Sequence, residues 1–406
     1  GTKTDYYSPV KVSAALRNWL SLSARKHSTG IKENGTFWNW GDNSTGELAD
    51  ETTIDKATPV QLGTDNKWIS SATGNAYTLG LKSDGTLWAW GSNKGGQLGD
   101  GTTGNKNTPL QIGNENTWIY VAANYRSSMA LKSDGTLWAW GSNSNGQLGD
   151  GTLINRTSPV QIGNHTNWLS IAPGVVHTLA LKSDGTLWSW GDNSGGQLGD
   201  GTTTNASTPK QIGNATNWIV VAAGEYQSFA LKSDGTLWAW GVNDHGQLGD
   251  GTTINKTAPV KIGTEDSWVM INTRESHVMG LKSDGSLWAW GLNDQAQLGD
   301  GTTTDQLQPV AVGTGTSWTS ISTGFNYSLC MHADRYLYCG TGANDKGQLG
   351  NSTRDQAINF VCVPGVPCAD IDGDGVLKFS DVSLLLEKLK QNCEKCAEDI
   401  NKDGTV

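Results

Sequence analysis

A repeat of 50 residues is the feature that most constrains the fold of this chain. The letters LKSDGTLWAWG occupy residues 81–91 and return unchanged at 131–141 and 231–241. Tryptophans followed by glycine keep the same period at Trp40, Trp90, Trp140, Trp190, Trp240 and Trp290, with Cys339-Gly340 as a degenerate seventh copy. A period of about 40 to 50 residues is typical of propellers and solenoids rather than of separate domains.

Each repeat contains four short segments that favour β-strands. In one copy they are residues 159–163, 167–174, 177–184 and 186–191, each rich in β-branched, aromatic or aliphatic residues and bounded by turn formers. Asp184-Gly185 predicts a two-residue type I′ hairpin turn. Four strands in each of seven repeats predict an all-β, seven-bladed β-propeller over residues 1–363. The repeated tryptophans are expected to pack between blades, and the alternative is an aromatic array for sugar stacking or electron transfer.

Positions that differ between repeats indicate where the propeller could recognise a partner. A variable triplet follows the second predicted strand of each copy and is enriched in Tyr, His and Arg, which are favoured at binding hot spots. Drift in solvated loops is the alternative, with the third position of the triplet pointing inward as a satisfied His or Tyr. The predicted binding face consists of Arg25, Tyr77, Tyr125, Arg126, Val176, Glu225, Tyr226, Glu275, Phe325 and Tyr327.

No catalytic constellation is evident in the repeats. His27, His177 and His277 occupy equivalent sites on different blades, and no Ser or Cys motif surrounds a nucleophile. The formal net charge of −10 disfavours nucleic acid as a partner, and no apolar run is long enough to span a membrane. The sequence therefore predicts a protein that is not an enzyme.

One predicted strand occurs more often than seven blades require. The PVQIG-like segment appears eight times, from residues 8–12 to residues 358–363. The first and last copies are expected to be redundant at the first blade, so that one pairs there and the other peels away. The alternative is that the surplus strand adds to the sheet of another copy and builds a filament.

All six cysteines lie in the last fifth of the chain, which favours disulfides and an oxidising compartment. Counting outward from the turn near residues 333–336 places Cys330 opposite Cys339, and this predicts a disulfide between them. Cys362, Cys368, Cys393 and Cys396 allow three pairings, between which the sequence does not choose. A tetrathiolate zinc site is the alternative for these four.

The composition changes after residue 364, where two calcium-loop patterns follow. Residues 370–381 place oxygen ligands at loop positions 1, 3, 5 and 12, a glycine at position 6 and a backbone carbonyl at position 7. A second loop begins at residue 399 and stops before its twelfth position. The predicted calcium ligands are Asp370, Asp372, Asp374, Val376, Asp381, Asp399, Asn401 and Asp403. Residues 380–390 between the loops predict a helix.

These motifs resemble two known families. Residues 130–152, ALKSDGTLWAWGSNSNGQLGDGT, are similar to the repeat of the regulator of chromosome condensation family, and the likeness covers residues 9–363. Its eukaryotic namesake is a nuclear guanine-nucleotide exchange factor, and its bacterial relatives include a secreted inhibitor of β-lactamase. The near-identical blades, the cysteines and the acidic balance resemble the secreted prokaryotic branch. Residues 369–406, within a predicted second domain of residues 364–406, resemble a dockerin, a small α-helical calcium module that binds a cohesin.

Together these resemblances imply an extracellular or cell-surface protein that binds other proteins. The propeller loops would recognise a partner, and the calcium-dependent tail would tether the protein to a cohesin-like module. A structural subunit that polymerises with copies of itself is one alternative, and an inhibitor of a secreted enzyme is another. A calcium-stabilised terminal cap is the alternative for the tail.

Overall fold

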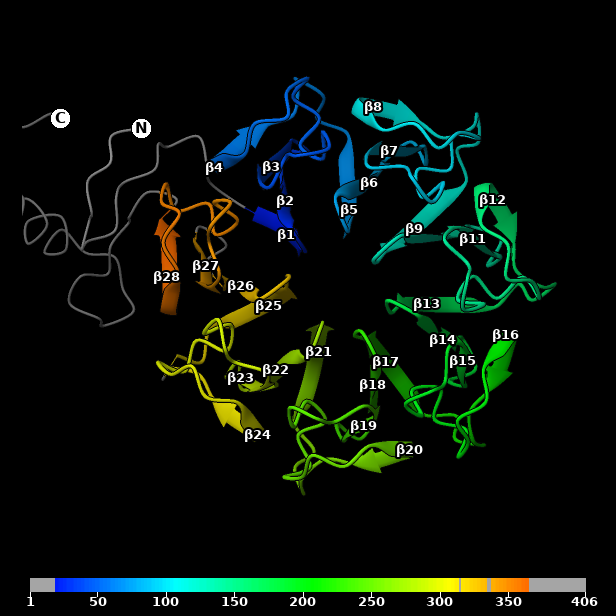
Figure 1. Cartoon of the computed structure of the whole chain (residues 1–406), viewed down its shortest axis with the longest axis vertical. Helices are drawn as coiled ribbons and strands as arrows, with labels where there is room; N and C mark the ends of the chain where they lie inside the picture. The colour runs from blue at the N-terminus through cyan, green and yellow to red at the C-terminus, as the bar shows by residue number, and fades with distance from the viewer. Residues whose placement is uncertain (1–18, 314, 334–336, 365–406) are drawn as a thin grey trace, which may run out of the picture.

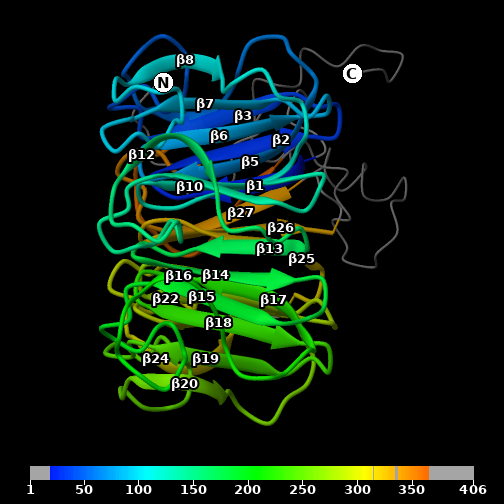
Figure 2. The same cartoon turned by 90° about the vertical axis from the view of Figure 1, so that its right-hand side faces the viewer.

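Seven four-stranded antiparallel sheets surround a central axis in the computed structural model of this protein (Figure 1). The structure describes residues 19–313, 315–333 and 337–364. Each sheet is one blade, and its strands follow one another from the axis outward in chain order (Figure 1). Seen from the side, the strands run across the thickness of the ring (Figure 2). The predicted all-β seven-bladed propeller is therefore confirmed over the described residues.

The first four blades have nearly identical strands. Blade 1 contains β1 (Trp19–Ala24), β2 (His27–Lys32), β3 (Phe37–Gly41) and β4 (Lys56–Gln61). Blade 2 contains β5 (Trp68–Gly74), β6 (Tyr77–Lys82), β7 (Leu87–Gly91) and β8 (Lys106–Gln111). Blade 3 contains β9 (Trp118–Ala123), β10 (Ser127–Lys132), β11 (Leu137–Gly141) and β12 (Arg156–Gln161). Blade 4 contains β13 (Trp168–Pro173), β14 (His177–Lys182), β15 (Leu187–Gly191) and β16 (Ala206–Gln211).

The last three blades follow the same pattern. Blade 5 contains β17 (Trp218–Ala223), β18 (Gln227–Lys232), β19 (Leu237–Gly241) and β20 (Lys256–Lys261). Blade 6 contains β21 (Trp268–Arg274), β22 (His277–Lys282), β23 (Leu287–Gly291) and β24 (Gln306–Ala311). Blade 7 contains β25 (Trp318–Thr323), β26 (Tyr327–His332), β27 (Leu337–Gly342) and β28 (Ala357–Pro364). Residues 365–406, with the predicted calcium loops and helix, lie outside the described residues.

The repeated tryptophans pack between blades, as predicted. Trp190 on β15 is fully buried, and its indole nitrogen donates a hydrogen bond to the backbone oxygen of Gln147 in the preceding blade, 2.9 Å away. The Lys182 ammonium lies 3.6 Å from the ring centroid of Trp188 and adds a cation–π contact at the edge of this layer. The same indole–carbonyl bond recurs at Trp40, Trp90, Trp140, Trp240 and Trp290. The Trp series therefore holds the blades together.

The turn between β14 and β15 differs from the predicted type I′ hairpin. The Gly185 N–H donates to the Lys182 oxygen at 2.9 Å, and Gly185 is left-handed at φ 76° whereas Asp184 is not. The Asp184 carboxylate accepts hydrogen bonds from the Thr186 hydroxyl at 2.6 Å and from the Thr186 N–H at 3.0 Å. A longer loop with one left-handed residue therefore replaces the predicted turn, because the aspartate side chain closes it.

Each blade takes its outermost strand from the following copy of the repeat. Residues 159–163, predicted to share a unit with the strands after them, overlap β12, which pairs with β11 in blade 3. Residues 358–363 fall in β28 and pair with β27 in blade 7. The prediction that this copy competes with residues 8–12 at the first blade is therefore wrong. The outermost strand of blade 1 is β4, and residues 8–12 lie outside the described residues.

Hydrogen bonds between blades 7 and 1, and not a shared sheet, close the ring, since every described blade is built from one continuous segment. The Tyr327 hydroxyl donates to the backbone oxygen of His27 at 3.0 Å. The Trp40 indole donates to the oxygen of Gln348 at 2.9 Å, which repeats the bond that joins the other blades. The same periodic contacts that join neighbouring blades therefore also join the first blade to the last.

The disulfide predicted between Cys330 and Cys339 is wrong. β26 and β27 do place the two residues opposite each other, as the count from the turn indicates. Cys330, however, is a buried free thiol that donates toward the backbone oxygen of Cys339, with the sulfur 3.6 Å away. Cys339 is disulfide-bonded, and its backbone partner on the other side of β27 is Cys362 of β28. Burial raises the pKa of the Cys330 thiol.

Candidate functional site

Seven short loops, each joining the innermost strand of a blade to its second strand, lie on one face of the ring, named here the inner-loop face. Hydrogen bonds link the backbones of neighbouring loops. The Asn75 N–H donates to Tyr125 O at 3.1 Å, and the Phe325 N–H donates to Arg25 O at 2.6 Å. The loops comprise residues 25–26, 75–76, 124–126, 174–176, 224–226, 275–276 and 324–326. All residues of the predicted binding face belong to these loops or follow them directly.

The third position of every variable triplet is buried, and in every blade except blade 3 its side chain bonds to the next blade. The Tyr77 hydroxyl donates to Ser127 O at 2.6 Å, and the Tyr327 hydroxyl makes the bond to blade 1 described above. Tyr77 and Tyr327 therefore hold blades together, and their prediction as binding residues is corrected. Such a tyrosine can turn inward because glycine precedes its loop: a Cβ on Gly74 would overlap the ring of Tyr77. The buried residues of this set are His27, Tyr77, Ser127, His177, Gln227, His277 and Tyr327.

The three histidines of this set are structural. The His177 Nε2 lies 2.8 Å from the Ser228 hydroxyl, and the His277 Nε2 lies 3.1 Å from the Ser328 hydroxyl. Burial lowers the pKa of His27 to about 3, and the pKa values of His177 and His277 to about 4. These imidazoles are therefore neutral at pH 7.

Arg25, another predicted binding residue, is 1% exposed and lies across the axis of the ring. Its guanidinium forms an ion pair with Glu275 of blade 6, with nitrogen and oxygen 3.1 Å apart, and donates to the Asn124 side-chain oxygen of blade 3. Burial lowers the pKa of Arg25, and the charge of Glu275 opposes that shift. Arg25 and Glu275 therefore form a buried brace between blades 1, 3 and 6, and Arg25 is not part of an open surface.

Arg274 is a residue of this site that the sequence analysis missed. It ends β21, and its guanidinium donates to the backbone oxygens of Ala123 at 3.2 Å and Thr73 at 3.4 Å, in blades 3 and 2. Comparison of the position before each triplet would have found it, since the other blades carry only small or short side chains there. The equivalent residues are Ala24, Gly74, Asn124, Gly174, Gly224 and Gly324.

The remaining predicted residues form the accessible part of the inner-loop face. Tyr125 is 39% exposed and Phe325 is 42% exposed. The Arg126 guanidinium lies 5.3 Å from the ring centroid of Tyr125, a cation–π geometry that orients the aromatic ring. The inner loops of blades 4 and 5 add three half-buried residues, Val176, Glu225 and Tyr226. This group, Tyr125, Arg126, Val176, Glu225, Tyr226 and Phe325, is named here the aromatic rim.

Glu225 makes the charge of this face sensitive to pH near neutrality. Burial, followed by repulsion from Glu275, raises the pKa of Glu225 from 4.5 to about 7. The Glu225 N–H also donates to the backbone oxygen of Glu275 at 3.4 Å, which holds the two acidic residues close together. Glu225 is therefore a proton-binding group at the edge of the buried brace.

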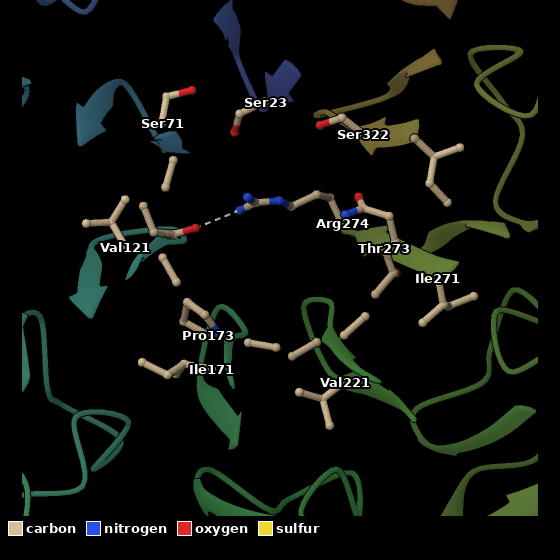
Figure 3. A pocket seen from close by; sticks show the side chains of 18 of the residues that line it. Ser23, Ser71, Val121, Ile171, Pro173, Val221, Ile271, Thr273, Arg274 and Ser322 are labelled. Atoms are coloured by element: carbon tan, nitrogen blue, oxygen red, sulfur yellow. Dashed lines mark hydrogen bonds between the residues drawn. The ribbon is translucent and has the colours of Figure 1, made fainter. Parts of the chain in front are cut away.

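A cavity of about 260 Å³ occupies the centre of the ring and is lined by the innermost strands of all seven blades (Figure 3). Ile171, Pro173 and Val221 line one side of it. Ser71 and Ser23 lie on the other side, and Arg274 extends between the two (Figure 3). Most of the lining residues are apolar in type, but most of the surface that they expose to the cavity is polar, and Arg274 is the one charged residue among those that the structure describes there.

The metal and cysteine sites predicted for the tail lie almost entirely outside the residues that the structure describes. The described residues contain no cluster of three or more His, Cys, Asp or Glu side chains able to hold a metal ion. They also contain no helix long and apolar enough to cross a membrane. The predicted calcium ligands, from Asp370 to Asp403, lie outside the described residues, as do Cys368, Cys393 and Cys396.

The blades and the aromatic rim define a seven-bladed propeller with a braced loop face. A family model described as the RCC1-like domain matches residues 111–371, and two models of the regulator of chromosome condensation (RCC1) repeat match residues 84–131 and 69–97. The chain belongs to the RCC1-like domain family, as its repeat indicates. A search of curated proteins finds no match.

Solved structures of low sequence identity share the fold. Human WBSCR16 is 21% identical with a TM-score of 0.73, over 81% of this chain and 94% of that chain. Prp20p from Saccharomyces cerevisiae is 20% identical with a TM-score of 0.73, over 95% of this chain and 100% of its own. Yeast RCC1 (Prp20), in a structure with Kap60, is 20% identical with a TM-score of 0.72, over 96% and 98%. At these identities the likeness shows the fold alone.

Proposed function

We propose that this protein is a non-enzymatic scaffold that binds a protein partner through the aromatic rim of its inner-loop face, outside the cell or at its surface. The observation that carries the proposal is the exposure of Tyr125 and Phe325 on loops whose backbones are hydrogen-bonded to one another. Exposed aromatic side chains contribute most of the binding energy in many interfaces. Loops that are already ordered lose little entropy when a partner binds.

The structural relatives support a role in protein binding. Prp20p has binding properties toward Gsp1p and histones, and yeast RCC1 (Prp20) is bound to Kap60 in its solved complex. The disulfide of Cys339 supports an oxidising compartment. The partner itself is expected to differ from those of the yeast protein, since the variable loops and not the repeated framework would select it.

Paired alanine variants test this proposal. Wild-type protein, Tyr125→Ala/Phe325→Ala and the control Ile119→Ala/Leu169→Ala would each be immobilised in an extract of secreted proteins, and bound proteins would be quantified by mass spectrometry. Ile119 and Leu169 are 57% and 59% exposed at the starts of β9 and β13, at the opposite ends of these strands from the inner loops, so the control removes a similar apolar area elsewhere. A partner retained by wild type and control but lost by the rim variant supports the proposal. Loss only in the control would refute it.

We further propose that the predicted loops of the tail bind calcium and tether the protein. The support is the spacing of carboxylates in residues 370–381, which suits a hard cation with several oxygen ligands. Calorimetric titration of the full chain with CaCl₂ is expected to show binding that Asp372→Asn/Asp374→Asn weakens. Equal binding by both proteins would refute the assignment. Binding of a cohesin-like module is the partner expected for this tail.

A self-associating structural subunit is a second candidate, favoured by one observation. The seven described sheets use seven of the eight copies of this strand, and the remaining copy, residues 8–12, lies outside the described residues. An extra strand can add to the outer edge of a neighbouring molecule. Electron microscopy of the full chain with calcium, and then with a chelator, distinguishes filaments from single rings.

A further inference from the structure

We infer that the central cavity of the ring binds one small tetrahedral oxyanion, with the size and chemistry of inorganic sulfate, and that Arg274 holds it. No residue of the aromatic rim lines this cavity, so the site is separate from the proposed recognition face. Three observations point to such a ligand: the polar surface of the cavity, a guanidinium without an acidic partner among the described ion pairs, and polar residues that gather there in place of the alanines of other blades.

The surface of the cavity is mostly polar because the free edges of the innermost strands face it. In each described blade the innermost strand pairs with one neighbour, so the N–H and C=O groups of its other edge have no strand partner (Figure 1). The side chains of Val121, Ile171 and Val221 are packed in the cores between blades and do not cover these groups. Such a surface suits a ligand that is polar on every side, because a polar wall needs hydrogen-bond partners.

The cavity has room for a small anion together with water. Its volume is about 260 Å³, whereas roughly 10–15 Å³ is enough for one water. Sites for drug-sized molecules begin at roughly 300 Å³. An ion of a few heavy atoms therefore fits in the cavity and keeps part of its hydration.

Arg274 places a positive charge in this cavity (Figure 3). Its hydrogen bonds to the backbone oxygens of Ala123 and Thr73 are long, at 3.2 and 3.4 Å, and use only part of a guanidinium that carries five N–H donors. Among the ion pairs of the described residues none involves Arg274, since its neighbour Glu275 pairs with Arg25. N–H donors therefore remain for an oxyanion, which can accept two of them from one guanidinium.

The charges at the centre of the ring favour an anion. Arg25 and Arg274 are two cations, whereas Glu275 is the one carboxylate in a described ion pair with either of them. Glu225, whose pKa is raised to about 7, adds only part of a second negative charge at pH 7. Burial, followed by repulsion from Arg25, lowers the pKa of Arg274 to about 9. An oxyanion in contact with the guanidinium would oppose this shift and stabilise the charged form.

One position of the innermost strand lines the cavity in all seven blades, and it is polar in three neighbouring blades. Blades 6, 7 and 1 carry Asn272, Ser322 and Ser23 there. Blades 2 to 5 carry only alanine, namely Ala72, Ala122, Ala172 and Ala222. Arg274 extends into the cavity from blade 6 and stands where four of its six equivalents are glycine. The blade framework therefore does not require these polar side chains, which gather on one side of the cavity.

These side chains offer hydrogen-bond donors to an oxyanion. The Thr323 N–H and hydroxyl donate to Asn272 Oδ1 at 2.9 and 2.7 Å, which fixes the amide and leaves its NH₂ group without a partner among the described hydrogen bonds. The Ser322 hydroxyl also takes part in none of them, and it points into the cavity together with that of Ser23 (Figure 3). Donors from several directions suit an ion with oxygens on all sides better than a carboxylate, whose oxygens lie at one end.

Binding of sodium sulfate to the full chain, measured by calorimetry and by equilibrium dialysis with radiolabelled sulfate, tests the inference. Sodium chloride is the match for charge without oxygens, and dimethyl sulfone is the neutral match of similar shape. Wild-type protein is expected to bind one sulfate per chain, at least about tenfold more tightly than either match, as charge-assisted hydrogen bonds imply. Absence of saturable sulfate binding, or equal binding of chloride or dimethyl sulfone, would overturn the assignment.

Three variants locate the site. Arg274→Ala removes the guanidinium, and Ser322→Ala introduces the residue that blades 2 to 5 carry at that position. Arg156→Gln is the matched control, since Arg156 pairs with Asp150 at 2.6 Å on β12, away from the cavity lining. Sulfate affinity is expected to fall about tenfold or more in Arg274→Ala, roughly three- to tenfold in Ser322→Ala, and not at all in the control. If Arg274→Ala does not fold, Ser322→Ala decides: unchanged affinity there refutes the cavity as the site.

A strut that ties blade 6 to blades 2 and 3 is the competing role of Arg274. Thermal unfolding with and without millimolar sulfate separates the two roles. An anion site predicts that sulfate raises the unfolding midpoint of the wild type more than that of Arg274→Ala, because a ligand stabilises the folded state that binds it. A strut alone predicts a lower midpoint for the variant and an equal effect of sulfate on both proteins, and this result would overturn the assignment.

Discussion

Glu47 is predicted to destabilise the protein at neutral and alkaline pH, and glutamine at this position is predicted to remove the penalty. Glu47 is fully buried in the loop after β3, and its Oε1 has no hydrogen-bond partner in the described part of the chain. The equivalent residue in every other blade is glutamine: Gln97, Gln147, Gln197, Gln247, Gln297 and Gln348. In blade 4 this amide donates to Asp192 at 2.6 Å, and Asp42 is the matching acid beside Glu47.

The magnitude follows from the pKa of the buried carboxyl group. Burial raises the pKa of Glu47 from 4.5 to about 7, a net shift to which the charge of Asp42 adds and which hydrogen bonds oppose. The folded state therefore binds the proton more tightly than the unfolded state. Stability from this group is complete below pH 4.5 and is lost as the pH rises to about 7. At about 1.4 kcal/mol per pKa unit, the loss above pH 7 is about 3 kcal/mol.

Urea denaturation at pH 5 and pH 8 measures this effect. Glu47→Gln is expected to raise the free energy of unfolding by about 2–3 kcal/mol at pH 8 and by much less at pH 5, since the wild-type carboxyl is then largely protonated. Glu51→Gln, which changes an exposed acid in the same loop of blade 1, is the control and should have little effect at either pH. An equal gain at both pH values, or a loss at pH 8, would refute this reasoning.

Three further variants test the contacts between blades. His177→Gln is expected to reduce the loss of stability on acidification. The lowered pKa of His177, about 4, makes the wild type lose up to about 3 kcal/mol of unfolding free energy as the pH falls from 6.5 to 4. Parallel curves of unfolding free energy against pH for variant and wild type, measured with urea, would contradict this role. Glu275→Gln is expected to lower the free energy of unfolding by about 3–5 kcal/mol, because it leaves Arg25 buried without a carboxylate. A loss below about 1 kcal/mol in the same urea assay would contradict the buried brace. Trp190→Phe removes the donor to Gln147 and should cost about 1–3 kcal/mol in thermal or urea unfolding, whereas an unchanged midpoint would exclude the inter-blade bond.

The fold follows from the sequence because its information is local and periodic. Trp190 and its equivalents recur in one phase, and strand length, turn glycine and apolar alternation recur with them. The assignment of the outer strand to a blade does not follow, since residues 159–163 lie closer in sequence to β13 than to β11, the strand with which this segment pairs. Pairing with β11 is determined by the backbone register of the folded sheet and not by the local sequence.

The site was only partly predictable from the sequence. Tyr125 and Phe325 are exposed as predicted, whereas Tyr77 is buried, because the orientation of a loop tyrosine depends on the room left by the glycine before it. Arg25 reaches Glu275 in blade 6, a contact across the ring that no local pattern indicates. Arg274 carries a visible signal, since it stands where other blades have glycine, and comparison of one more column of the repeat reveals it.

Site-specific photo-crosslinking tests the proposed recognition face most directly. A photoreactive amino acid would replace Tyr125 in one protein and Leu169 in another; Leu169 is exposed at the start of β13, at the opposite end of the strand from the inner loop. After irradiation in the extract of secreted proteins, position 125 is expected to give a discrete adduct with a single partner, and position 169 is expected to give none. Adducts formed at position 169 but not at position 125 would contradict recognition through the inner-loop face.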